Sequence, residues 1–375
     1  MLFRSQFFYN IHKTLDGYLV ACGIARIEGN IQKEGIRAAL DWLQARHPLL
    51  RCEIVEGDAP YFRRIDTPES IPLAAMQMED DLHWRRASTN SVYEDFVSPG
   101  SPLMRVTLLS DDRTNFHDLI VACHHSIIDA DAIVSTIEAI LGLHEDWKNN
   151  SLKNPDEIEN LVFEPNLPEF KVLDKAKFIR QGIAELIKPS AKVPEKHGWN
   201  FDKLNHLPTL DVLDKEKSIK LLERCKQERT TVYGLMHALT MHTLKPYLEP
   251  ENNKIRNTIA VKVRTRVEPR IPSNLYGAFI SIIPEVYQFD QKESIWEAAR
   301  SAKQRVNNFV NRLQPFKEFS RVRWKRKTDY SSFKGRSFAA AIDSLGIFHT
   351  KESYGDLKFK TYSQKIGRAS CRERV

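Results

Sequence analysis

A group of ionisable side chains directly follows an apolar, strand-like run, and this feature constrains the fold more than any other. The run Leu119–Cys123 is almost wholly apolar, and the next residues read HHSIIDA (His124–Ala130). Burying such groups without partners costs several kcal/mol, so their concentration at the end of a buried strand indicates a functional site. Apolar residues then recur with helical spacing from Ile133 to Leu141, and Gly142 is the predicted stop. We therefore expect a strand, a polar loop and a helix in succession.

The two adjacent histidines cannot both serve one cleft. Successive side chains of an extended chain point to opposite faces, so only one of His124 and His125 can act as a base there. A neutral imidazole near a hydroxyl or amine can take its proton as that group attacks a carbonyl. A buried core histidine is the alternative for His125, and a helix N-cap is the alternative for Asp129. Because the adjacent histidines point in opposite directions, at most two of these groups could bind one metal ion, so no metal site is expected.

The flanking segments indicate a layered α/β unit. Apolar residues from Ile36 to Leu43 have helical spacing, and Pro48 is expected to stop that helix. The strand pattern of LRCEIV (Leu50–Val55) places Arg51 on the face opposite the apolar residues. The run Leu103–Leu109 and the run Leu119–His124 are separated by a polar turn, which predicts that they form a hairpin or pair as near neighbours.

The chain is predicted to divide into two units. Its 375 residues favour two domains, and the boundary is placed where apolar periodicity weakens and prolines accumulate. We expect an N-terminal unit over 1–145, a crossover over 146–208 with a short helix near 178–187, and a C-terminal unit over 209–364. The C-terminal unit is expected to contain helices over 213–225 and 293–313, a helix capped by Thr230 or Thr231, and strands over 259–263, 278–284 and 357–362.

Composition excludes several protein classes. With 42% hydrophobic and 28% charged residues, the chain is neither disordered nor a disulfide scaffold. Its five cysteines show no metal-binding spacing, no apolar run approaches the ~20 residues of a membrane span, and the N-terminus lacks a signal-peptide pattern. We therefore expect a cytoplasmic protein with no membrane span. Net charge is +7, and the basic run Arg321–Lys327 is read as a solvated helix face rather than a nucleic-acid site.

The last eleven residues differ from the rest. KIGRASCRERV (Lys365–Val375) follows a strand-like run without turn chemistry, and it resembles the translation of a sequencing adapter. The expectation is that 365–375 are foreign to the fold and that the C-terminal unit is incomplete, a fragment. A genuine basic tail is the alternative.

Ordered motifs along the chain resemble those of the HHxxxDG acyltransferases. This superfamily includes chloramphenicol acetyltransferase, condensation domains of peptide synthetases and alcohol acyltransferases. Besides HHSIIDA, the matching segments in order are RHPLLR (Arg46–Arg51), PLMRVTLL (Pro102–Leu109), ERTTVYGLMHAL (Glu228–Leu239), VRTRVEP (Val263–Pro269), YGAFIS (Tyr276–Ser281) and DSLG (Asp343–Gly346). The HHxxxD motif alone is a moderate signal, and the ordered set makes it specific.

The resemblance implies an α/β fold of the α+β sandwich type, with two chloramphenicol-acetyltransferase-like domains and a tunnel between them. It implies that His125 is the catalytic general base and that His124 supports the loop. It also implies that Asp129 is structural and ion-paired with Arg51. Ala130 stands where the family motif has glycine, which a helical backbone tolerates.

The implied function is transfer of an acyl group from acyl-CoA to a small alcohol or amine, in a direct ternary complex. Acyl-CoA is then a co-substrate, no cofactor is bound, and the complete enzyme is expected to be a monomer. The alternative is a condensation-type or non-catalytic domain that docks an acyl carrier protein.

Overall fold

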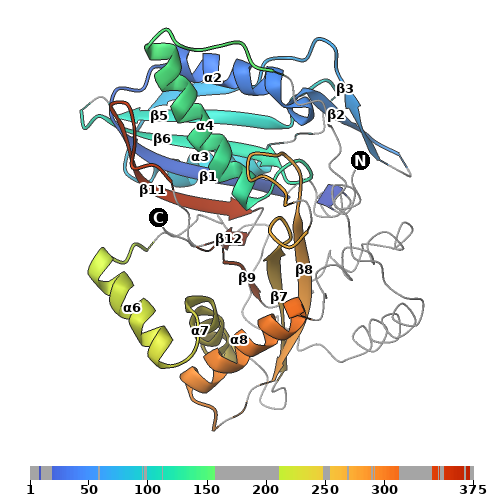
Figure 1. Cartoon of the computed structure of the whole chain (residues 1–375), viewed down its shortest axis with the longest axis vertical. Helices are drawn as coiled ribbons and strands as arrows, with labels where there is room; N and C mark the ends of the chain where they lie inside the picture. The colour runs from blue at the N-terminus through green and yellow to red at the C-terminus, as the bar shows by residue number, and fades with distance from the viewer. Residues whose placement is uncertain are drawn as a thin grey trace.

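The computed structural model of the protein describes residues 8–9, 19–57, 60–94, 96, 99–111, 113–156, 211–247, 254–267, 270–288, 290, 292–311, 340–344, 346, 350–366 and 369–371. They form two lobes, each of which combines helices with a sheet (Figure 1). This confirms the expected α/β class with two units. The predicted helix near 178–187 and the basic run 321–327 lie outside the described residues.

The first lobe is built around a seven-stranded sheet. Its elements are β1 (Val20–Glu28), α2 (Lys33–Arg46), the 3-10 turn η1 (Pro48–Arg51), β2 (Cys52–Val55), β3 (Tyr61–Arg64), β4 (Leu73–Gln77), α3 (His83–Tyr93), β5 (Met104–Asp111), β6 (Phe116–His124), α4 (Ala130–Lys148), β10 (Ser353–Tyr354), β11 (Leu357–Ile366) and β12 (Ala369–Cys371). The strand order is β10-β11-β1-β6-β5-β4, with β12 paired to β11.

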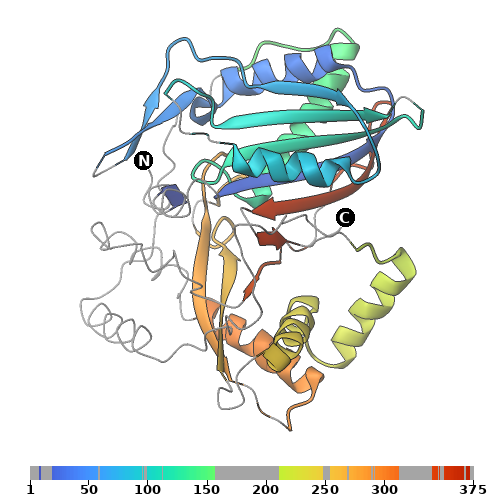
Figure 2. The same cartoon turned by 180° about the vertical axis from the view of Figure 1, so that it is seen from behind.

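Strand β6 lies in the interior of this sheet. It pairs antiparallel with β1 on one side and with β5 on the other, which confirms the predicted pairing of 103–109 with 119–124. Helices α2 and α4 cover one face of the sheet, and α3 covers the other (Figures 1 and 2). Because both edges and both faces of β6 are covered, its apolar run is buried, as in strands enclosed on all sides.

Helix α4 lies very close to the sheet because β1 contains a glycine beneath it. A Cβ added at Gly23 would be 2.2 Å from Cγ2 of Ile133. The apolar residues of α4 at the expected helical spacing are all fully buried: Ile133, Ile137, Ile140 and Leu141. The helix continues past Gly142 to Lys148, so the predicted stop was wrong; there the buried face continues to Leu143 and His144.

The strand near the C-terminal end differs from the domain division expected from sequence. Residues 357–362 were assigned to the C-terminal unit, but β11 pairs antiparallel with β1 of the first lobe from Glu28↔Lys358 to Ala21↔Ile366. Strand β1 would otherwise present an open edge beside β6. The first-lobe sheet is therefore assembled from both ends of the sequence.

The second lobe is smaller. Its elements are α6 (Lys215–Gln227), α7 (Val232–Leu244), the 3-10 turn η3 (Lys245–Tyr247), β7 (Lys254–Lys262), β8 (Ile280–Gln288), α8 (Ile295–Asn311) and β9 (Ala340–Ile342). The three strands have the order β8-β7-β9, with β9 parallel to β7. Thr231 is the predicted cap that the structure uses, since its hydroxyl accepts from the Gly234 N–H at 3.0 Å at the start of α7.

Candidate active site

The histidine loop, residues 124–129, connects β6 to α4 at the edge of the first lobe. The backbone N–H of His124 donates to Leu103 O on the β5 side at 3.0 Å, and that of His125 donates to Leu19 O on the β1 side at 3.2 Å. The two residues therefore bond to opposite neighbours, as the alternation of a strand requires. Their side chains also have separate partners.

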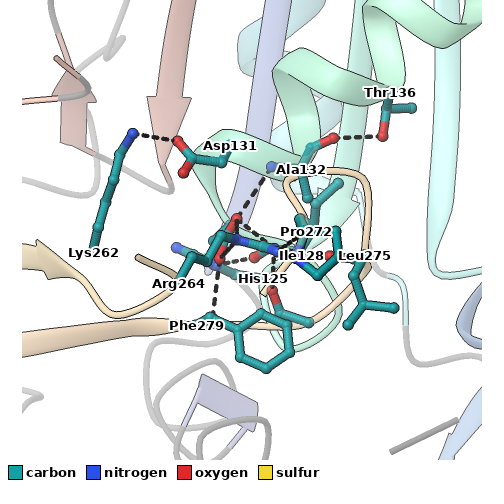
Figure 3. Close-up of polar contacts among 12 residues, drawn as sticks. His125, Ile128, Asp131, Ala132, Thr136, Lys262, Arg264, Pro272, Leu275 and Phe279 are labelled. Carbon is teal, nitrogen blue, oxygen red and sulfur yellow. Dashed lines mark hydrogen bonds and ion pairs between the residues drawn. The ribbon is translucent and has the colours of Figure 1, made fainter. Parts of the chain in front are cut away.

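The imidazole of His125 is held in one tautomer. Its Nδ1–H donates to the carbonyl oxygen of Ile128 at 2.7 Å (Figure 3), so the proton is on Nδ1 and Nε2 retains its lone pair. Burial of the ring lowers the pKa of His125, and the Ile128 carbonyl only partly offsets this effect. The ring is therefore neutral at pH 7, which is the state a general base needs.

The imidazole of His124 bonds to the turn that follows it. Its Nδ1 accepts from the backbone N–H of Ser126 at 3.2 Å and lies 2.7 Å from the Ser126 hydroxyl. Because Nδ1 accepts the backbone donor, the imidazole proton is on Nε2. Thus His124 contacts the turn that follows it, whereas His125 presents an unprotonated nitrogen.

Asp129 joins the two lobes, but through a different arginine from the one expected. Its carboxylate accepts from Arg264 Nε at 2.8 Å and from Arg264 Nη2 at 2.9 Å, and from the backbone N–H of Phe279 at 3.0 Å. It also caps α4 by accepting from Ala132 N at 3.2 Å. The predicted pairing with Arg51 is therefore wrong, while the N-cap alternative holds. Capping and ion pairing coexist because a carboxylate has about four acceptor positions.

Arg51 lies away from this carboxylate, in the 3-10 turn before β2. The sequence pattern implied a strand from Leu50, but Pro48–Arg51 form the turn η1 and the strand begins at Cys52. Arg51 is half-buried there, and its carbonyl oxygen accepts from Ile65 N at 2.8 Å.

Arg264 fixes the loop that precedes β8. It is 2% exposed, and besides Asp129 its guanidinium donates to the carbonyl oxygens of Pro272 and Leu275 and lies over the Phe279 ring, 4.7 Å from its centroid. The fork of five N–H donors suits this multiple bonding. The motif VRTRVEP contains Arg264, but the sequence did not indicate its role. The only local feature that could have pointed to it is that this arginine directly follows an apolar strand.

Two further contacts connect the lobes beside the histidine loop. Lys262 Nζ lies 2.7 Å from the carboxylate of Asp131 in the first turn of α4 (Figure 3). The hydroxyl of Tyr276, from the loop before β8, lies 2.8 Å from the Thr136 hydroxyl, and its ring meets His47 edge-on with centroids 4.7 Å apart. Tyr276 is part of the apolar core of the first lobe, and its burial raises the pKa of the phenol, which stays protonated.

Asp343, just after β9, is a carboxyl that the fold keeps partly protonated. Burial raises its pKa to about 6; a hydrogen bond from Ser344 N–H and the charge of Lys262 oppose this rise, and the charge of Asp131 adds to it. A pKa above that of the unfolded chain means that ionisation destabilises the fold, so stability is lost as pH rises from about 4 through 6.

We expect Asp343→Asn to stabilise the protein by about 1–3 kcal/mol at pH 8, and by less at pH 5, where the native carboxyl is still largely protonated. Urea unfolding at the two pH values measures this. The Asp66→Asn variant is the control, because Asp66 is an exposed carboxyl of the first lobe and its loss should leave stability nearly unchanged at both pH values. An equal effect of Asp343→Asn at both pH values would contradict the raised pKa.

Some features bear on other classes of site. In the part of the chain that the structure describes, no group of three or more His, Cys, Asp or Glu side chains is arranged to hold a metal ion. None of the described helices is both long and apolar enough to span a bilayer.

Comparisons with known proteins identify the family and the fold of the chain. The profile of the condensation-domain family matches residues 4–332. No curated protein sequence matches the chain. The solved structures described below are less than 20% identical to the chain, so their similarity concerns the fold alone.

Three solved structures illustrate that fold. The first condensation domain of the calcium-dependent antibiotic synthetase has a TM-score of 0.67 at 10% identity, covering 97% of this chain and 83% of that chain. Polyketide synthase associated protein 5 from Mycobacterium tuberculosis has a TM-score of 0.61 at 13% identity, covering 95% and 84%. The SgcC5 protein from Streptomyces globisporus has a TM-score of 0.59 at 18% identity, covering 93% and 79%.

Proposed function

The chain belongs to the condensation-domain family, and we propose that it transfers an acyl group from a thioester to an alcohol or amine, with His125 as general base. Condensation domains are in general transferases. The observation that carries the proposal is the His125 ring, which is buried, neutral and fixed by Ile128 with Nε2 unprotonated. It lies on a loop that Asp129 ties to the second lobe, where two substrates can meet.

The proposed chemistry needs one proton transfer and no covalent intermediate. Nε2 of His125 takes the proton from the acceptor hydroxyl or amine as that group attacks the thioester carbonyl. The new C–O or C–N bond forms, the tetrahedral species collapses, and the C–S bond breaks. The imidazolium then returns the proton to the departing thiolate. His124 and Asp129 are proposed to support the loop rather than to react.

The donor is either acyl-CoA or a thioester on a carrier protein. The resemblance of the sequence motifs implies acyl-CoA, and docking of an acyl carrier protein is the alternative. The family match and the synthetase condensation domain among the similar structures support the carrier-bound donor, since such domains work with carrier-bound substrates. We therefore include the carrier-bound thioester in the proposed function, with acyl-CoA as the second donor to be tested.

We expect the protein to form an ester or amide product when it is given an acyl thioester and a panel of alcohols and amines. Mass spectrometry would compare the rate with an acyl-CoA against the rate with the same acyl group on a phosphopantetheinylated carrier protein. A carrier preference of tenfold or more in kcat/KM corresponds to about 1.4 kcal/mol of transition-state binding.

The His125→Ala variant is the matched control for both donors. Product formed equally by wild type and by His125→Ala would contradict the role of the base. Absence of product with either donor, in folded protein, would favour the non-catalytic docking alternative, which a binding assay with the acylated carrier protein would then test.

A further inference from the structure

An aromatic residue from the N-terminal segment covers one face of the proposed base. The ring of Phe8 is stacked on the His125 imidazole, with centroids 4.5 Å apart and the planes 18° from parallel. The next residue, Tyr9, lies beside His124, with centroids 6.3 Å apart and an angle of 29°. Phe8 is 1% exposed and His125 is 2% exposed. Two consecutive aromatic residues thus contact the two consecutive histidines.

The burial of Phe8 differs from that of ordinary core residues. Tyr9 belongs to the apolar core of the first lobe, and its hydroxyl donates to Glu56, which anchors the segment. Phe8, in contrast, belongs to none of the apolar clusters formed by the described residues. Its ring is stacked on a titratable ring in the candidate site.

The stacked Phe8 ring fixes the tilt of the His125 imidazole, which the hydrogen bond to Ile128 does not fix. The bond from Nδ1–H to Ile128 O fixes one edge of the imidazole, but the ring could still tilt about that edge. A ring stacked at contact distance prevents the tilt and leaves no room for substrate or water on that face. A molecule that reaches Nε2 must therefore approach along the ring plane or from the other face.

The stacked Phe8 ring restricts the acceptor in particular. In the proposed function, the group that meets Nε2 is the nucleophile of the acceptor. Bulk on the carbon next to that nucleophile would extend to both sides of the imidazole plane, and on one side it would collide with Phe8. An unbranched carbon leaves that side empty.

We propose that Phe8 is a positioning and specificity-determining residue, which holds the His125 ring and selects acceptors with an unbranched carbon next to the nucleophile, that is, primary alcohols or primary amines on a CH₂ group. This inference rests on the proposed role of His125 as base. It adds a substrate class to that role and a residue that neither the motifs nor the hydrogen-bond network identified.

The test compares Phe8→Leu and Phe8→Tyr with the wild-type chain. Wild type should prefer a primary acceptor to its α-branched isomer, and Phe8→Leu should reduce that preference about tenfold in kcat/KM. Phe8→Tyr keeps a stacked ring and should retain the wild-type preference. Phe96→Leu is the matched control, because Phe96 is an equally buried phenylalanine of the same lobe that lies under Arg105. It should leave the preference unchanged.

A second readout does not depend on turnover. NMR titration of labelled histidine in the full chain should show the pKa of His125 rising towards 6.5 in Phe8→Leu, because water gains access to the exposed face, and remaining at the wild-type value in Phe8→Tyr and Phe96→Leu. An unchanged His125 pKa together with an unchanged acceptor preference in Phe8→Leu would overturn the inference while the proposed function stands. Turnover that survives His125→Ala would instead overturn the proposed function.

Discussion

Replacing His125 with alanine should lower kcat by about 10²- to 10⁴-fold, the usual contribution of a positioned general base, while the protein remains folded. The side chain follows the end of β6, and its hydrogen bond within the described part of the chain goes to Ile128, so we expect the rest of the loop to stay in place when it is removed. Steady-state kinetics and circular dichroism on the same preparation measure the two effects. Wild-type kcat in the variant would contradict the assignment.

His124→Ala provides the comparison within the same loop. His124 is fully buried and bonds Ser126, so its removal should reduce stability and soluble yield more than the chemical rate. A folded His124→Ala protein with the full kinetic loss, beside an active His125→Ala protein, would show that the two roles are reversed.

The pH profile offers a second check on His125. Burial lowers its pKa in the free protein, so the acid limb of kcat/KM should lie below pH 6.5, where an exposed imidazole titrates. Because the base must be unprotonated, the rate is lost as pH falls through that lowered value. The same shift means that protonation destabilises the fold, so stability also decreases as pH falls below about 6.5.

Several parts of the fold were predictable because they depend on local patterns. The antiparallel pair 103–109 and 119–124, the loop between β6 and α4, and the buried face of α4 all follow from residue alternation and helical spacing. The opposite environments of His124 and His125 followed from the same alternation. Each of these features involves residues that are close in sequence.

The partner of Asp129 could not be found in this way. Alternation places Arg51 on a plausible face of its strand, but periodicity gives no information on which distant segment lies beside a carboxylate. The chosen arginine, Arg264, is 135 positions away and belongs to the other lobe. Phe8 was missed for the same reason, since a stacking partner far away in sequence has no local signature. The pairing of β11 with β1 is likewise a long-range contact between the two ends of the sequence.

The ion pair between Asp129 and Arg264 should be worth about 3–5 kcal/mol when one partner is removed, because the other is then left as a buried, unpaired charge. Both side chains are 2% exposed, so water cannot solvate the remaining group. Asp129→Asn and Arg264→Met should each lower the free energy of unfolding severely. The double variant should lose about 1–3 kcal/mol less than the two single losses together, since contacting residues are not additive. Urea unfolding of the four proteins measures this cycle.

A parallel cycle with Arg51 separates the observed partner from the one that the sequence suggested. Arg51 is the last residue of the turn η1, whereas the Asp129 carboxylate bonds Arg264, Phe279 and Ala132. Asp129→Asn and Arg51→Met should therefore be additive within about 0.5 kcal/mol, as expected for residues without a shared contact. A coupling energy between Asp129 and Arg51 that exceeds the one with Arg264 would show that Asp129 pairs with the arginine of its own lobe. The loop that presents His125 would then be held within one lobe, and its position would no longer depend on how the two lobes meet.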